Sequence, residues 1–196
     1  MLAIPNTEGQ EVSTPRQEQI RREAARMFAE FGYHGVSIED LGGAVGISGP
    51  GVYRHFTSKD ALLADLLVGI SEDLLENARV EVAGSGSPGE AIVRLVDRHL
   101  AFSLSEPDLI RVQDRDLASL SPFALHQVRR LQRGYVELWV DQLVPPLTRE
   151  QARARAHAVF GLLNSTPRIE DPELHAPMLR QMALAALTAP DTLAPA

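Results

Sequence analysis

Apolar residues recur along this chain at the three- and four-residue spacing of amphipathic helices. One clear apolar stripe follows Thr14 in the sequence and comprises Ile20, Ala24, Met27, Phe28 and Phe31. The segment that follows Ser58 is apolar on more than one face, which is typical of a helix packed between two layers. No stretch alternates apolar and polar residues between hairpin turns. The pattern therefore predicts an all-α protein.

Helix-start signals divide the chain further. The first N–H groups of a helix lack partners inside it, and a preceding Ser, Thr or Asp side chain accepts a bond from one of them. Proline is also favoured in the first turn. The predicted starts are Thr14, Ser37, Ser48, Ser58, Ser87, Glu106-Pro107, Ser121-Pro122, Thr148 and Asp171-Pro172. They predict about nine helices.

Residues 37–45 and 48–55 are predicted to form two short helices around a turn that contains Gly46. Two such helices form a helix-turn-helix, whose second helix can enter the major groove of DNA. A phosphate can approach the backbone N–H groups that follow Ser48. Lys59 lies at the start of the next predicted helix, where its positive charge is unfavourable beside the positive end of the helix dipole. A lysine at this position is better explained if its ammonium group binds a DNA phosphate.

The overall net charge of −7 points away from nucleic acid. Residues 14–60, however, carry as many basic as acidic side chains, so the acidity lies elsewhere. Without cysteine the chain has no disulfide, thiolate metal site or cysteine nucleophile. The six histidines show no metal-binding spacing. We therefore expect no enzyme, no cofactor and no metal. With no signal peptide or membrane span visible, we expect a cytoplasmic protein.

Residues 52–63 read Val-Tyr-Arg-His-Phe-Thr-Ser-Lys-Asp-Ala-Leu-Leu, and shorter matches precede them at 28–33, 37, 40–41 and 45–48. On these residues the segment 14–67 resembles the DNA-binding domain of the TetR family of transcriptional repressors. The resemblance implies that the chain binds a double-stranded DNA operator. The residues expected to contact DNA are Ser37, Ser48, Gly49, Pro50, Gly51, Tyr53, Arg54, His55 and Lys59.

Some positions depart from the family pattern. Val36, Gly49 and Gly51 lack the hydrogen-bonding groups often present there, so we expect DNA shape to carry more of the specificity. Three of these residues also have a structural alternative: Tyr53 as a half-buried packing residue, Lys59 as a solvated surface lysine and His55 as a support of the following turn. Gly42 and Gly43 cost a helix about 1 kcal/mol each relative to alanine, with no reason visible in the sequence.

The resemblance also implies a second, helical part. The expected organisation is a disordered arm (1–13), a helix-turn-helix domain (14–60), a ligand-binding and dimerisation domain (61–189) and a flexible tail (190–196). A palindromic operator requires two reading helices about one DNA turn apart, hence a homodimer. Small and apolar residues in the last two helices, near 149–165 and 172–188, are candidates for its interface. The alternative is that they face only the monomer's own core.

A ligand pocket is expected between the middle helices, although a plain hydrophobic core has the same composition. The candidate wall residues are Leu95, His99, Phe102, Val112, Tyr135, Trp139, Phe160 and Asn164. For a charged acyl thioester, Arg98, Arg111 or Arg115 are the candidate cations. The resulting hypothesis is a repressor released from a palindromic operator by a small, largely apolar effector. The alternatives are a regulator without an effector and an activator.

Overall fold

The computed structural model describes residues 14–190, and over that range it contains helices and no strand. The α-helices are α1 (Pro15–Phe31), α2 (Ile38–Ala44), α3 (Gly49–Val52), α4 (Lys59–Ala83), α5 (Pro88–Ser105), α6 (Pro107–Asp116), α7 (Pro122–Leu143), α8 (Arg149–Leu163) and α9 (Pro172–Thr188). Three short 3-10 helices are η1 (Tyr33–Gly35), η2 (Leu117–Ser119) and η3 (Thr166–Arg168). The all-α prediction is confirmed. The predicted arm 1–13 and residues 191–196 of the predicted tail lie outside the described residues.

The helices begin where the sequence predicts. Thr14 and Thr148 form the expected capping boxes with the glutamines three residues later. Ser37 forms a further box with Asp40. Two starts differ in mechanism, because Glu106 before α6 and Asp171 before α9 make no side-chain cap. Asp171 also has a φ of 50°.

The predicted second helix of the helix-turn-helix, 48–55, is shorter than expected. Regular α-helix covers only Gly49–Val52, and a hydrogen-bonded turn follows in which the His55 amide donates to the Val52 carbonyl at 2.9 Å. The helix ends because Phe56 is drawn into the core and Ser58 takes the extended conformation that caps α4.

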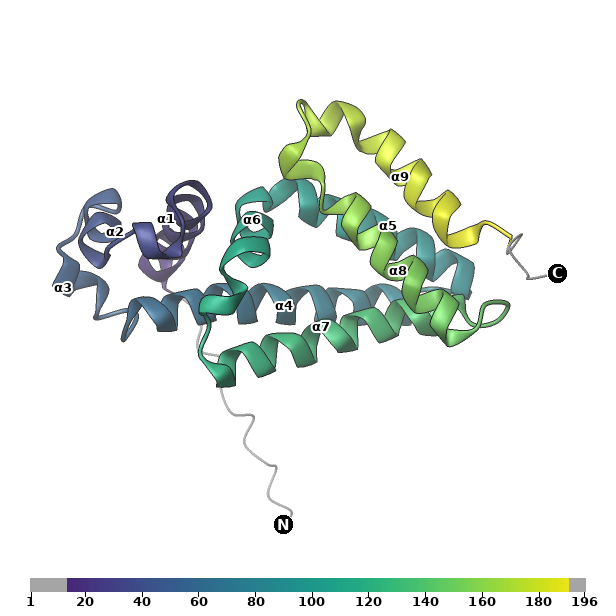
Figure 1. The fold of residues 1–196 in the computed structure, drawn as a ribbon, viewed down its shortest axis with the longest axis horizontal. Helices are drawn as coiled ribbons and strands as arrows, with labels where there is room; N and C mark the ends of the chain where they lie inside the picture. Colours follow the sequence, from purple (N-terminus) through teal and green to yellow (C-terminus); the bar gives the residue numbers. More distant parts are fainter. Residues whose placement is uncertain (1–13, 191–196) are drawn as a thin grey trace, which may run out of the picture.

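Figure 1 shows how the elements are arranged. Helices α1–α3 gather at one end of the molecule, and the long helix α4 runs from them into the body formed by α5 and α7–α9. Helix α7 lies along α4, and α6 stands between α1 and the rest of the body. Within residues 14–190, each helix is too short or too polar to cross a bilayer.

Helix α4 belongs to two hydrophobic clusters. Its first half, including Leu62 and Leu67, packs with α1–α3 and with Val112 of α6. Its second half, including Leu75, packs with α5, α7, α8 and α9. A rigid helix shared by both clusters can transmit movement of the body to the α1–α3 end.

Candidate DNA-binding surface and effector cavity

The turn between α2 and α3 is unusually close, and Gly42 makes this possible. A Cβ at Gly42 would lie 2.8 Å from the Ile47 carbonyl oxygen and 3.0 Å from the Gly49 amide nitrogen. Gly46 in the same turn has a φ of 72°, a value that glycine adopts at little cost. The contact accounts for the glycine at position 42. Nothing in the structure explains Gly43, which faces open space.

Three of the predicted contact residues are exposed on and after α3. Pro50 and Arg54 are exposed, and Tyr53 is 50% exposed, which is compatible both with a DNA contact and with the alternative of a half-buried packing residue. The Arg54 guanidinium has no hydrogen bond or ion pair within residues 14–190. Gly51 and His55 are half-buried beside them. This end therefore presents a ring and an unpaired cation to an approaching molecule.

The two capping serines and Gly49 have contacts inside the protein. The Ser37 hydroxyl hydrogen-bonds the Asp40 carboxylate at 2.6 Å, which lowers the pKa of Asp40. The Ser48 hydroxyl accepts from the Gly51 amide at 3.3 Å. Gly49 is buried, and a Cβ there would lie 3.1 Å from the Glu39 carboxylate. In this structure Gly49 acts as a close-packing residue.

Lys59 is half-buried, unlike the solvated lysine of the alternative interpretation. Its ammonium donates to the carbonyls of Tyr33 at 2.9 Å and Val36 at 2.7 Å. It also lies 4.4 Å from the centre of the Tyr33 ring, a cation–π contact. The Tyr33 hydroxyl donates to Asp60, and burial together with that carboxylate raises the pKa of Tyr33. Lys59 thus holds η1, the segment that leads into α2.

The nine predicted contact residues all lie at the end of the molecule formed by α2, α3 and the start of α4. Direct contact with DNA stays a prediction for each of them.

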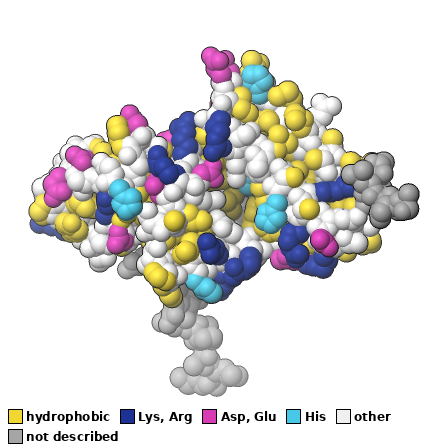
Figure 2. All heavy atoms as spheres, in the orientation of Figure 1, with side chains coloured by type: hydrophobic (Ala, Val, Ile, Leu, Met, Phe, Trp, Pro, Cys, Tyr) yellow, Lys and Arg dark blue, Asp and Glu magenta, His cyan; other side chains and the backbone are white. Residues whose placement is uncertain are grey.

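The body of the protein contains a cavity of about 200 Å³ between α4, α5, α6, α7 and α8. Figure 2 shows the hollow on one face of the molecule. The residues that line it are Ser71, Leu74, His99, Phe102, Ile110, Gln113, Gln132, Tyr135, Val136, His157, Phe160 and Asn164. The predicted wall residues His99, Phe102, Tyr135, Phe160 and Asn164 are among them, while ligand binding itself stays a prediction.

Three predicted wall residues lie elsewhere. Val112 faces the cluster around α1 and α4, because the opposite side of α6 faces the cavity. Leu95 is buried in the second cluster. Trp139 lies behind the wall, fully buried, with its ring centre 4.9 Å from that of Phe160.

The sequence interpretation missed polar lining residues such as Gln113 and Gln132. It followed apolar bulk, whereas these residues lie at the border between the buried and exposed faces of α6 and α7. Helical spacing could have found them, since Gln132 precedes Tyr135 and Val136 by three and four residues.

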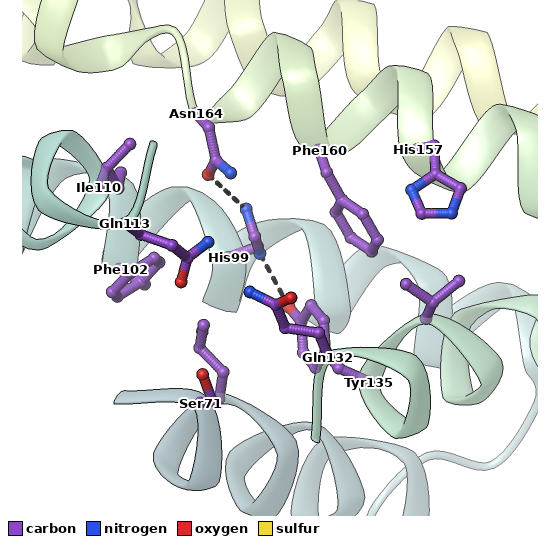
Figure 3. A pocket seen from close by; sticks show the side chains of 12 residues that line it. Ser71, His99, Phe102, Ile110, Gln113, Gln132, Tyr135, His157, Phe160 and Asn164 are labelled. Carbon is purple, nitrogen blue, oxygen red and sulfur yellow. Dashed lines mark hydrogen bonds between the residues drawn. The ribbon is translucent and has the colours of Figure 1, made fainter. Parts of the chain in front are cut away.

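A chain of neutral hydrogen bonds crosses the cavity wall. His99 Nδ1 lies 2.9 Å from the Tyr135 hydroxyl, and His99 Nε2 lies 2.9 Å from Asn164 Oδ1 (Figure 3). Burial lowers the pKa of His99 to about 4, so its ring is neutral at pH 7 and carries one N–H. We assign that proton to Nε2, which donates to Asn164, and the Tyr135 hydroxyl then donates to Nδ1. Burial also raises the pKa of Tyr135.

The cavity lining contains no Asp, Glu, Lys or Arg. The amides of Gln113 and Gln132 point toward its centre and have no hydrogen-bond partner within residues 14–190 (Figure 3). A charge would be costly to bury there, while an uncharged polar group could bond to the amides. The arrangement favours an uncharged ligand. No group of three His, Asp or Glu side chains within the described range is placed to bind a metal.

Helix α6 connects this cavity to α1. Ile110 and Gln113 line the cavity, while Arg115 at the end of α6 donates to the Phe28 carbonyl and, at 3.2 Å, to the Ala29 carbonyl. These carbonyls belong to the last turn of α1, which has no basic residue of its own. Arg115 therefore supplies the cation that the negative end of the α1 dipole favours.

The tight α2–α3 turn and its exposed flank define a helix-turn-helix protein. Residues 20–66 match the family model described as "Bacterial regulatory proteins, tetR family". This stretch of the chain, which contains α2, α3 and the start of α4, is thus a DNA-binding domain of the TetR type.

Individual relatives and solved structures are similar to a larger part of the chain. The HTH-type transcriptional repressor KstR2 of Rhodococcus jostii is 26% identical over 130 residues, which cover 65% of this chain and 63% of the repressor. The aligned part thus spans just under two thirds of that relative. A TetR-family regulator of Bordetella parapertussis superposes with a TM-score of 0.82 at 24% identity over 90% of this chain and 96% of its own. The regulator AibR, solved with isovaleryl coenzyme A and operator DNA, has a TM-score of 0.73 at 16% identity, over 87% and 96% of the two chains.

Proposed function

We propose that this protein is a transcriptional repressor that binds a palindromic DNA operator and is released by a small-molecule effector. The main observation in support is the α2–α3 pair, packed closely around Gly42, with Tyr53 and Arg54 exposed beside it. The family-model match over residues 20–66 and the similarity to a repressor support the same conclusion. In this proposal α3 lies in the major groove, and Ser37, Ser48 and Lys59 position it on phosphates.

The proposed operator complex contains a homodimer formed through α8 and α9. Helix α9 exposes large apolar side chains, Leu174 at 74%, Met178 at 49% and Met182 at 47%. Small exposed residues on α8, such as Ala154 and Ala158, permit close approach of a second helix. Two copies related by a two-fold axis would bury these faces and provide the paired reading helices.

The proposed effector occupies the cavity beside His99. Ligand pockets usually measure roughly 300–1,000 Å³, so a cavity of about 200 Å³ suits a short acyl chain or a single ring rather than a large molecule. The AibR complex makes a coenzyme A thioester one candidate. The small volume also favours the alternative of a DNA-binding regulator that needs no effector, and an activator would use the same surfaces.

Fluorescence anisotropy with labelled DNA from upstream of the protein's own gene tests operator binding. We expect saturable binding that survives excess unrelated DNA, and at least a tenfold loss in the Tyr53→Ala and Arg54→Ala variants. The matched control is Arg79→Ala, an exposed arginine of α4 whose ion pair lies within that helix. Equal affinity for operator and unrelated DNA would contradict the proposal.

A further inference from the structure

Most arginines of this protein are neutralised or hydrogen-bonded. Within residues 14–190, the arginines that form no ion pair or hydrogen bond are Arg22, Arg54, Arg129, Arg130 and Arg133. Three of them lie on little more than one turn of α7. All three are exposed, in a protein whose net charge is −7. An unpaired cationic group of this kind on an acidic protein requires an explanation.

This α7 arginine patch, Arg129, Arg130 and Arg133, adjoins the cavity. Gln132 on the same helix lines the cavity and is half-buried, so it lies at the border between wall and surface. At 3.6 residues per turn, Arg129 and Arg133 project about 60° and about 100° around the helix from Gln132, toward its exposed side. Figure 2 shows basic side chains gathered over α7 on the face that carries the hollow.

The other arginines near the cavity are occupied. Arg98 donates to Asn77, and Arg111 donates to Asp108 and to the Pro167 carbonyl. Arg115 is bound to the end of α1. The cations suggested by the sequence for an effector's charge therefore all have internal partners, and the α7 patch does not.

We propose that the α7 arginine patch binds the phosphate groups of an effector whose uncharged end occupies the cavity. The inference rests on the proposed effector function and specifies its chemistry. The ligand has two parts: a small neutral acyl chain or ring among His99 and the two glutamines, and a phosphate-bearing part on Arg129 and Arg133. Guanidinium groups suit phosphate because their N–H donors form paired, charge-assisted bonds. A free carboxylic acid does not fit, since its charge would enter the uncharged cavity.

Isothermal titration calorimetry of the full chain, without DNA, tests whether the two parts of the effector bind at these two places. The probes are isovaleryl-CoA and benzoyl-CoA, the matching N-acetylcysteamine thioesters, which lack phosphate, and the free acids. We expect at least one CoA thioester to bind ten or more times tighter than its phosphate-free counterpart, and the free acids to show no binding. Binding of the CoA thioester should also weaken with salt.

The double variant Arg129→Ala/Arg133→Ala should lose at least tenfold in affinity for the CoA thioester and keep its affinity for the phosphate-free one. Arg129→Lys/Arg133→Lys should recover part of the loss. The control Arg79→Ala/Arg94→Ala removes the same charge from arginines whose ion pairs lie within α4 and α5. We expect it to bind like the parent protein.

Several results would overturn the inference. These are equal affinity for the two thioester types, no binding of any probe, or no effect of the Arg129→Ala/Arg133→Ala change. A loss of effector-free operator affinity in that variant would instead assign the patch to DNA. The proposed repressor function is tested separately by the anisotropy assay. It would fail if the unmodified protein showed no specific operator binding.

Discussion

The substitutions Gly42→Ala and Gly43→Ala should change stability in opposite directions, although the two glycines are neighbours in α2. Replacing glycine by alanine inside a helix contributes about 1 kcal/mol at either position. At Gly42 the new methyl group would lie 2.8 Å from the Ile47 carbonyl oxygen and 3.0 Å from the Gly49 nitrogen. At Gly43 it would meet no atom within 4 Å. The helix term cancels between the variants, so their difference measures the contact alone.

The atoms facing Gly42 are backbone atoms of the turn and cannot rotate away as a side chain would. Overpacking of this kind costs about 1–3 kcal/mol. We therefore expect Gly42→Ala to destabilise the protein by up to about 2 kcal/mol net. Gly43→Ala should stabilise it by about 0.5–1 kcal/mol. For a chain of this length, each kcal/mol corresponds to roughly 2–4 °C in Tm.

Urea unfolding followed by far-UV circular dichroism measures the difference, provided that the slopes of the transitions agree. Operator affinity gives a second readout, because a displaced turn would tilt α3. We expect Gly42→Ala to weaken operator binding. Stability of Gly42→Ala equal to or above that of Gly43→Ala would refute the proposed close approach of α2 to the turn.

Three further predictions concern the body of the protein. Because burial lowers the pKa of His99 from 6.5 to about 4, the unfolded chain takes up a proton at a higher pH than the folded protein. The contribution of His99 to the free energy of unfolding is therefore fully present above pH 6.5 and decreases by up to about 3 kcal/mol toward pH 4. Urea unfolding at several pH values, compared with the same series for His99→Gln, should isolate this decrease. Arg115→Ala removes the contact with α1, so it should weaken effector-free operator binding about tenfold in the anisotropy assay and leave little further release by the effector; unchanged affinity and response would exclude this link. Met178→Glu should dissociate the dimer in sedimentation experiments, and Val80→Glu, at a site that is 61% exposed, should not.

The helix starts could be predicted because capping is local. Thr14 and Gln17, or Thr148 and Gln151, lie within four residues of each other, so the sequence contains both partners of the interaction. The end of α3 was harder to predict. It depends on where Phe56 packs, and that is decided by contacts with α1 and α4. Local signals therefore predict beginnings better than ends.

The candidate cavity could be predicted only in part, because apolar patterning does not reveal which way each helix is rotated. Val112 and Ile110 are both buried on α6, yet they face different neighbours. The partners of the arginines could not be predicted from the sequence either. Arg115 bonds to Phe28, 87 residues away, while Arg129 and Arg133 bond to nothing described. Only the tertiary structure separates occupied cations from free ones.

Helix α6 has partners on each of its sides, and this makes it the most direct connection between the two candidate sites. Ile110 and Gln113 face the cavity, Arg111 binds the Pro167 carbonyl near the end of α8, and Arg115 binds the end of α1. A ligand that shifts the backbone of α6 at Gln113 would therefore strain these contacts. A tenfold change in operator affinity requires only about 1.4 kcal/mol. A hydrogen bond to a charged group contributes about 1.5–3 kcal/mol, so loss of the Arg115 contact with α1 is sufficient for the response, and no large rearrangement of the body is needed.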